Sequence, residues 1–139
     1  MGSYQKSYRL VQGPMTLCVK ILLPHGHIWT FGEVDCFVDS ILKKAEPLPR
    51  LDPMQIANET ARATFVSVVP VVKAELNYTS DAGVWQKRLW KSVAAELANG
   101  QVTVKLPAER PLVCCLSVTD QRGLVVSTPH EEFPAADGK

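Results

Sequence analysis

The sequence lacks several features that define whole classes of protein. It has no segment of about 20 consecutive apolar residues, the length that an α-helix needs to cross a bilayer. Its 15 basic and 14 acidic residues nearly cancel, and it has no Lys/Arg-rich block. Nucleic acid and membrane surfaces are therefore not expected as partners. The first residues also lack the apolar core of a secretory signal peptide, so the sequence leaves the compartment open.

A metal-binding cysteine pattern is also missing. The four cysteines are Cys18, Cys36, Cys114 and Cys115, and no CxxC pair or Cys/His cluster accompanies them. Cys114 and Cys115 are adjacent within an apolar segment, so in a strand their side chains point to opposite faces. We expect free thiols, with no metal and no cofactor.

What is present is a globular composition, with 46% hydrophobic and 21% charged residues. In the first 49 residues, the mostly polar segment Ser3–Leu10 predicts a short helix. The apolar and β-branched run Met15–Leu23, bounded by turn signals, predicts a strand in a covered sheet. The loop from Pro24 to Thr30 follows, and it carries His25 and His27.

The strongest helix signal comes directly after this loop. Apolar residues recur at i, i+3, i+4, i+7 and i+8 and form one stripe, which consists of Val34, Phe37, Val38, Ile41 and Leu42. Thr30 and Glu33 have the spacing of an N-terminal capping box. Pro47 and Pro49 end the helical pattern, and the segment Pro47–Pro53 has the composition of a linker.

Beyond this linker the periodicity changes from 3.6 toward 2. Strand character is found in six segments, at residues 61–69, 71–79, 85–95, 101–106, 112–119 and 124–128. Asn99-Gly100 is the best hairpin turn in the chain, whereas Trp85–Leu97 also fits a helix. The pattern predicts an Ig/fibronectin-like antiparallel β-sandwich over residues 50–133, followed by a disordered tail at residues 134–139.

Residues 1–49 resemble the C-terminal catalytic segment of α/β-hydrolase esterases, in particular acetylxylan-esterase-like and dienelactone-hydrolase-like proteins. The resemblance is carried by Gly13-Pro14-Met15-Thr16-Leu17-Cys18-Val19-Lys20-Ile21, Leu23-Pro24-His25-Gly26-His27, Glu33, Phe37-Val38-Asp39-Ser40-Ile41-Leu42 and Pro47-Leu48-Pro49. Many such proteins have an Ig-like β domain after the hydrolase domain. The resemblance therefore implies an α+β chain: an incomplete strand–loop–helix segment of an α/β-hydrolase at 1–49, then the sandwich.

The resemblance also implies a catalytic role for the histidines. A histidine on a loop at the end of a strand can serve as a general base, although a loop histidine without a catalytic role has the same sequence signature. His27, which follows a small residue, is the preferred triad base, and His25 is the alternative. No G-x-S-x-G nucleophile motif exists, and no acidic residue precedes Pro24. We therefore expect a serine esterase fragment that is inactive alone.

Two classes of partner follow from these alternatives. As an esterase fragment, the chain would act on an acyl ester, such as an acetylated polysaccharide, and a complementary N-terminal hydrolase chain would complete it. As a non-catalytic β-sandwich module, it would bind carbohydrate or protein. Trp85 and Trp90, with Tyr78, could stack on sugar rings, but packing within the sandwich is the commoner use of such residues.

Overall fold

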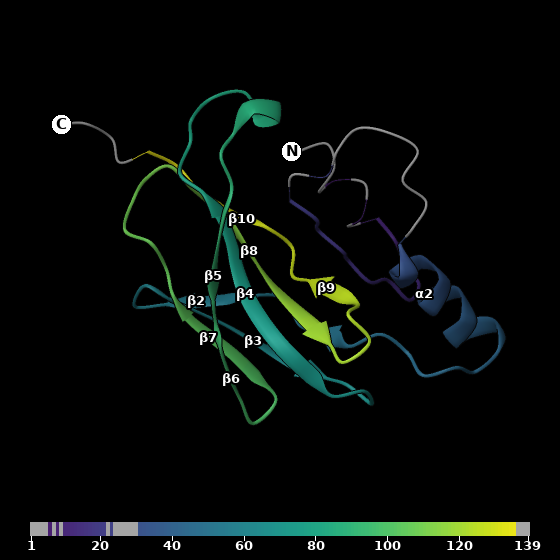
Figure 1. The fold of residues 1–139 in the computed structure, drawn as a ribbon. Coiled ribbons are helices and arrows are strands. Elements are labelled where there is room, and N and C mark those ends of the chain that lie inside the picture. The colour runs from purple at the N-terminus through teal and green to yellow at the C-terminus, as the bar shows by residue number, and fades with distance from the viewer. Residues whose placement is uncertain (1–5, 7, 9, 22, 24–30, 136–139) are drawn as a thin grey trace.

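In a computed structural model, which describes residues 6, 8, 10–21, 23 and 31–135, the chain forms two antiparallel sheets and the helix α2 (Gly32–Leu42). Figure 1 shows the sheets as two layers, with α2 outside them beyond β9. Every strand pairing among the described residues is antiparallel. This architecture fits a β-sandwich.

The first sheet has the strand order β1-β3-β7-β6, and β2 also pairs with β3. Its strands are β1 (Arg50–Leu51), β2 (Gln55–Ala57), β3 (Thr60–Val66), β6 (Glu96–Ala98) and β7 (Gln101–Lys105). β6 and β7 form the hairpin predicted at Asn99-Gly100, with Ala98 paired to Gln101. Both turn residues have positive φ angles, 51° and 74°, which a two-residue turn of this hand requires.

The second sheet has the order β10-β8-β4-β5, with β9 also paired to β8. Its strands are β4 (Val71–Thr79), β5 (Lys91–Ala94), β8 (Leu112–Asp120), β9 (Val125–Ser127) and β10 (Glu131–Phe133). The short 3-10 helix η1 (Trp85–Lys87) lies in the connection between β4 and β5.

The core lies between the two sheets and follows from strand alternation. Leu76 of β4 and Leu116 of β8 are fully buried, and they pair directly. Across from them, the small side chains of Ala61 and Ala63 leave room for Val102 on the neighbouring strand β7. Successive side chains in a strand face opposite sides of the sheet, so the apolar residues at alternate positions of each sheet lie together on its inner face.

The outer face of the second sheet is also buried and has a polar centre. The amide of Asn77 donates to the Ser117 hydroxyl at 2.9 Å, and that hydroxyl lies 2.9 Å from the Ser127 hydroxyl. The Val19 N–H donates to Ser127 Oγ at 3.1 Å. These hydrogen bonds give partners to polar side chains that lie beneath the N-terminal segment. A buried polar group without a partner would lower the stability of the fold.

The predicted α+β fold class, with an α/β-hydrolase segment over residues 1–49, is wrong. The described residues from Met15 to Leu23 form no strand and no parallel pairing, although they are apolar and β-branched. Only isolated bonds hold them to the sandwich, including Ser127 N–H to Leu17 O at 2.8 Å. With no parallel neighbour to complete a ladder, the run follows the surface of the antiparallel sandwich as an extended segment.

The start of α2 differs from the predicted capping box in the residues that the structure describes. The N-cap residue of α2 is Phe31, which makes no side-chain cap hydrogen bond, and Thr30 lies outside the described residues. Glu33 is instead buried and bonded to distant parts of the chain. The Glu33 carboxylate thus bonds mainly to groups outside α2, Lys20 Nζ and the Val125 N–H.

Candidate functional site

His25 and His27, the predicted catalytic residues, lie outside the described residues, and the esterase interpretation stays a prediction. The described cavities with the most apolar lining lie between α2 and the segment that precedes it. We therefore build the candidate site from α2 and from the contacts that fix it to the sandwich.

The first of these contacts is made by the buried carboxylate of Glu33. Its Oε1 accepts hydrogen bonds from Lys20 Nζ at 2.8 Å and from the Val125 N–H at 3.0 Å. Burial alone would raise the pKa of Glu33, but the hydrogen bonds from Lys20 and Val125 outweigh it and lower the pKa. Glu33 is therefore ionised at neutral pH, and it joins α2, the N-terminal segment and the start of β9.

The second contact is made by Arg122, in the turn between β8 and β9. Its Nη1 donates to Glu46 O and its Nη2 to Pro47 O, each at 2.9 Å. The same guanidinium forms an ion pair with the fully buried carboxylate of Asp120, with Nη2 at 2.6 Å from Oδ2. Arg122 thus holds the segment that follows α2 against the sandwich, across the boundary predicted between residues 49 and 50.

These contacts hold one face of α2, with Glu33 at its centre, against the sandwich. Glu33 is buried, and Cys36, Phe37 and Ser40 are half-buried. The rest of the predicted apolar stripe is exposed, at fractions of 60% for Val34, 43% for Val38, 55% for Ile41 and 75% for Leu42. We call these four residues the α2 ridge.

The α2 ridge lies to one side of the face that is held. At about 100° per residue, its mean direction is about a third of a turn from that of Glu33, Phe37 and Ser40. Phe37, at the margin of the stripe, is the stripe residue that packs against the main core. An amphipathic helix normally turns its apolar stripe to the core, so this orientation leaves apolar surface uncovered.

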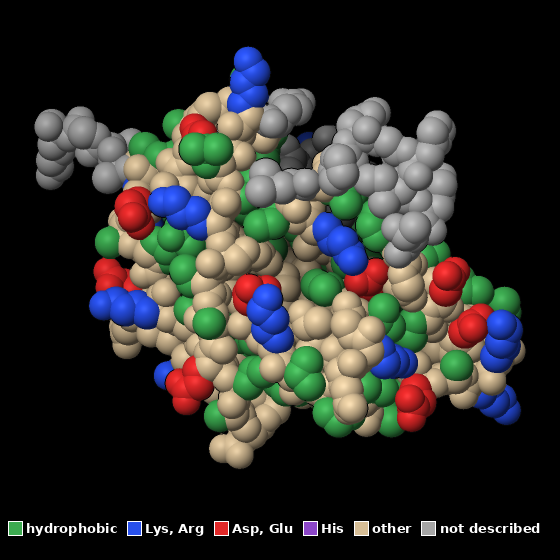
Figure 2. Space-filling model, in the orientation of Figure 1, with side chains coloured by type: hydrophobic (Ala, Val, Ile, Leu, Met, Phe, Trp, Pro, Cys, Tyr) green, Lys and Arg blue, Asp and Glu red, His purple; other side chains and the backbone are tan. Residues whose placement is uncertain are grey.

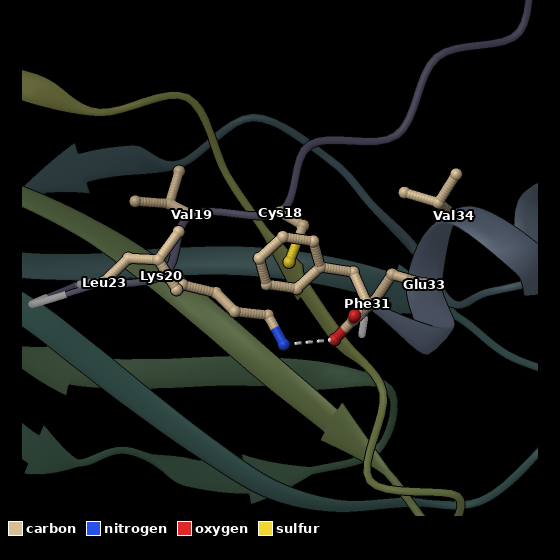
Figure 3. Close-up of a pocket in the computed structure, with 7 residues that line it drawn as sticks. All are labelled: Cys18, Val19, Lys20, Leu23, Phe31, Glu33 and Val34. Atoms are coloured by element: carbon tan, nitrogen blue, oxygen red, sulfur yellow. Dashed lines mark ion pairs between the residues drawn. The ribbon is translucent and has the colours of Figure 1, made fainter. Parts of the chain in front are cut away.

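A cavity of about 390 Å³ lies beside the ridge, lined by Cys18, Val19, Lys20, Leu23, Phe31, Glu33 and Val34. In Figure 3, Lys20 and Glu33 point toward each other, with the Phe31 ring and the Cys18 sulfur beside them. Lys20 Nζ is 5.3 Å from the centre of the Phe31 ring, a distance that allows cation–π attraction. A second cavity of about 370 Å³ shares Cys18, Glu33 and Val34 with the first.

The lining of these cavities carries little free charge and no reactive thiol. Burial, and then the nearby Glu33 carboxylate, raise the pKa of the Cys18 thiol, so it is a poor nucleophile at neutral pH. The charges of Lys20 and Glu33 neutralise each other. Within the part of the chain that the structure describes, no cluster of His, Cys, Asp or Glu could hold a metal ion. The cavities therefore offer mainly an apolar surface.

The tryptophan pair occupies a different region and is already covered. The rings of Trp85 and Trp90 lie 6.1 Å apart and are tilted by 31°, and the Arg88 guanidinium sits 4.1 Å from the Trp85 ring centre. The His130 ring meets Trp85 edge-on at 6.5 Å. Tyr78 is buried, at 8% exposure. Trp85 therefore has Trp90, Arg88 and His130 as neighbours, and Tyr78 belongs to the main core, so the three rings form no common open platform for sugar rings.

On the face of the molecule drawn in Figure 2, the charges are mixed in sign. Figure 2 shows Lys and Arg side chains interspersed with Asp and Glu, with hydrophobic side chains between them. No helix among the residues described is both long enough and apolar enough to span a membrane.

Comparisons with known proteins add no assignment: no protein-family model, no curated protein and no solved structure matches the chain. The resemblance to esterases stays a prediction.

Sequence reasoning did not identify Lys20, Glu33 and Arg122 as the residues that orient α2. Glu33 is separated from Val125 by 92 positions, and Arg122 is separated from Glu46 by 76. No local spacing links such residues, because the fold alone brings them together. The apolar stripe was the one available signal, and it located the surface without giving its orientation.

Proposed function

We propose that this protein is a non-catalytic β-sandwich module that binds a protein partner through the α2 ridge. The observation that carries the proposal is the exposure of the ridge, with its four apolar side chains 43–75% exposed on a helix that Glu33 fixes to the sandwich. A contiguous exposed apolar surface is typical of a protein-interaction site.

The geometry of the ridge favours a helical partner segment. Val34, Val38 and Ile41 are spaced i, i+4 and i+7, which is the spacing of the seam between two packed helices. An amphipathic helix from a partner could place its own apolar residues between them, as in helix-in-groove recognition. Covering these half-exposed side chains is worth about 1 kcal/mol each, which supports a weak or transient complex.

Carbohydrate binding, the other expectation for such a module, has less support. Sugar rings are held by exposed aromatic faces together with hydrogen-bonding groups. The Arg88 guanidinium lies over the Trp85 ring and Trp90 is tilted beside it, and the ridge itself carries only aliphatic side chains. A protein partner matches this surface better.

The proposal is tested with a displayed library of random peptides panned against the chain. Selected peptides are then titrated against wild type, against the ridge variant Val38→Lys/Ile41→Lys, and against the control Val66→Lys/Val68→Lys. The control valines are 69% and 68% exposed and lie away from α2. We expect amphipathic peptides whose affinity falls at least about tenfold in the ridge variant alone. Equal affinity for both variants, or no selected peptide, would contradict the proposal.

A further inference from the structure

A cavity of about 430 Å³ lies on the first sheet, where the connection between β1 and β2 passes along β3. Its lining is polar, unlike that of the two cavities beside α2, and shares no residue with them. The polar side chains that line it are Asp52, Gln55, Arg62, Thr64 and Gln101. Arg62 and Thr64 are the exposed residues that alternate with buried alanines along β3, so both project from the face turned away from the core.

The strand register fixes where the two charged groups of this cavity lie. Asp52 is bonded to Thr64 twice: its N–H donates to Thr64 O at 2.9 Å, and its Oδ2 accepts from Thr64 Oγ1 at 2.6 Å. The carboxylate is therefore held beside Thr64. Arg62 lies two positions earlier on the same face of β3, about 7 Å away along the strand. Gln55 is paired with Arg62, and Gln101 is paired with Thr64.

The two charges line one cavity without meeting each other. Arg50 Nε is the basic nitrogen paired with Asp52, at 3.9 Å from Oδ1, which is beyond hydrogen-bond distance, and the Arg50 side chain is 80% exposed. Within the part of the chain that the structure describes, Arg62 makes no hydrogen bond and no ion pair. The Arg62 guanidinium thus keeps its N–H donors, and Asp52 Oδ1 keeps its capacity to accept.

We propose that this cavity binds a small zwitterion of the α-amino-acid class, with its carboxylate on Arg62 and its ammonium group on Asp52. A guanidinium is well suited to a carboxylate, because it donates two parallel hydrogen bonds to it. A ligand with only a negative charge would be repelled by Asp52, and one with only a positive charge would be repelled by Arg62. A zwitterion satisfies both groups at once.

The rest of the lining indicates the size and polarity of the ligand. A cavity of about 430 Å³ has room for a complete small amino acid. The amide groups of Gln55 and Gln101 can each donate and accept, which suits a short polar side chain such as that of serine. Because the Asp52 side chain is 49% exposed, water screens its charge, so we expect a dissociation constant of about 1 mM.

A titration of the full chain with L-serine, followed by ¹H–¹⁵N NMR at pH 7, measures this binding. We expect saturable shifts of the backbone amide signals of Asp52, Arg62 and Thr64 below about 20 mM serine. Arg62→Met and Asp52→Asn should each raise the dissociation constant at least about fivefold. The control Lys105→Met, at an exposed position of β7 outside the cavity, should bind serine as wild type does. Unchanged signals away from the cavity establish that each variant is folded.

Acetate and methylammonium test the two charges separately. We expect each to bind at least about fivefold more weakly than serine, because each leaves one charged group of the cavity without a partner. Three results would overturn the inference: no saturable shift with serine up to about 20 mM, acetate binding as tight as that of serine, or equal serine affinity in wild type and Arg62→Met. The ridge variant Val38→Lys/Ile41→Lys should bind serine normally, so this experiment is independent of the proposed function.

Discussion

Replacement of Arg122 by methionine removes the side chain that holds the segment after α2. The guanidinium donates from Nε and Nη2 to Asp120 Oδ2, at 2.9 and 2.6 Å. It also donates to the carbonyl oxygens of Glu46 and Pro47. Methionine retains much of the aliphatic stem but donates no hydrogen bond. Asp120, whose side chain is fully buried, would keep the backbone N–H groups of Arg122 and Leu124 as donors.

The expected cost follows from the burial of Asp120. Removing one partner of a fully buried ion pair costs about 3–5 kcal/mol. The Arg122 side chain is 29% exposed and Asp120 keeps two donors, so the loss should be smaller, about 2–3 kcal/mol. With a urea m value of about 2 kcal/mol/M for a chain of this size, the midpoint of unfolding should fall by about 1–1.5 M.

Urea denaturation monitored by tryptophan fluorescence and by circular dichroism measures this shift. Arg62→Met, at an exposed position of β3, is the matched control and should change the free energy of unfolding by less than about 0.5 kcal/mol. The double variant Asp120→Leu/Arg122→Met should lose less than the sum of the two single variants, since no uncompensated charge stays buried. A midpoint shift for Arg122→Met no larger than that of the control would refute the reasoning.

Three further predictions concern Glu33, the cysteines and the core. The pKa of Glu33 is lowered on folding, so its stabilisation is present above its ordinary pKa of 4.5 and is lost as the pH falls through its folded value. Glu33→Gln should therefore destabilise the protein by about 1–2 kcal/mol at pH 7 and by less at pH 3. Urea midpoints at both pH values measure the two losses, and an equal loss at both would contradict the assignment. Burial raises the pKa values of Cys114 and Cys115 to about 12. Iodoacetamide at pH 8 should therefore modify these two thiols only when urea unfolds the protein. Mass spectrometry that found them labelled in the native protein would contradict their burial. Leu116→Ala, at a fully buried core position, should cost about 2–5 kcal/mol in calorimetry or urea unfolding, whereas Val66→Ala at an exposed position serves as a control with little effect.

Local sequence patterns predicted those parts of the fold that local interactions determine. The hairpin at Asn99-Gly100 is confirmed, because both turn residues adopt the positive φ angles that these residue types tolerate. The long strands β3, β4 and β8 lie within or close to the segments predicted from their apolar content. The strands β1, β2, β6 and β10 have two or three residues each, too few for a periodic signal to appear.

The parts of the fold that local sequence patterns did not predict depend on contacts between residues far apart in the chain. The run Met15–Leu23 has strand composition, but a strand requires a neighbour that completes its ladder, and Ser127 supplies only isolated bonds to Leu17 and Val19. The stripe of α2 was predicted correctly, yet the contacts of Glu33 with Lys20 and Val125 rotate it toward solvent. Hydrophobic periodicity indicates which residues share a face, but not what that face contacts.

Hydroxyl-radical footprinting with mass spectrometry tests the orientation of α2 most directly. We predict that Val38, Ile41 and Leu42 are oxidised at rates similar to that of Leu89, which is 74% exposed. Leu76 and Leu116, which are fully buried, should stay unmodified. If the three α2 residues were protected as strongly as Leu116, the stripe would face the sandwich and the proposed binding surface would not exist.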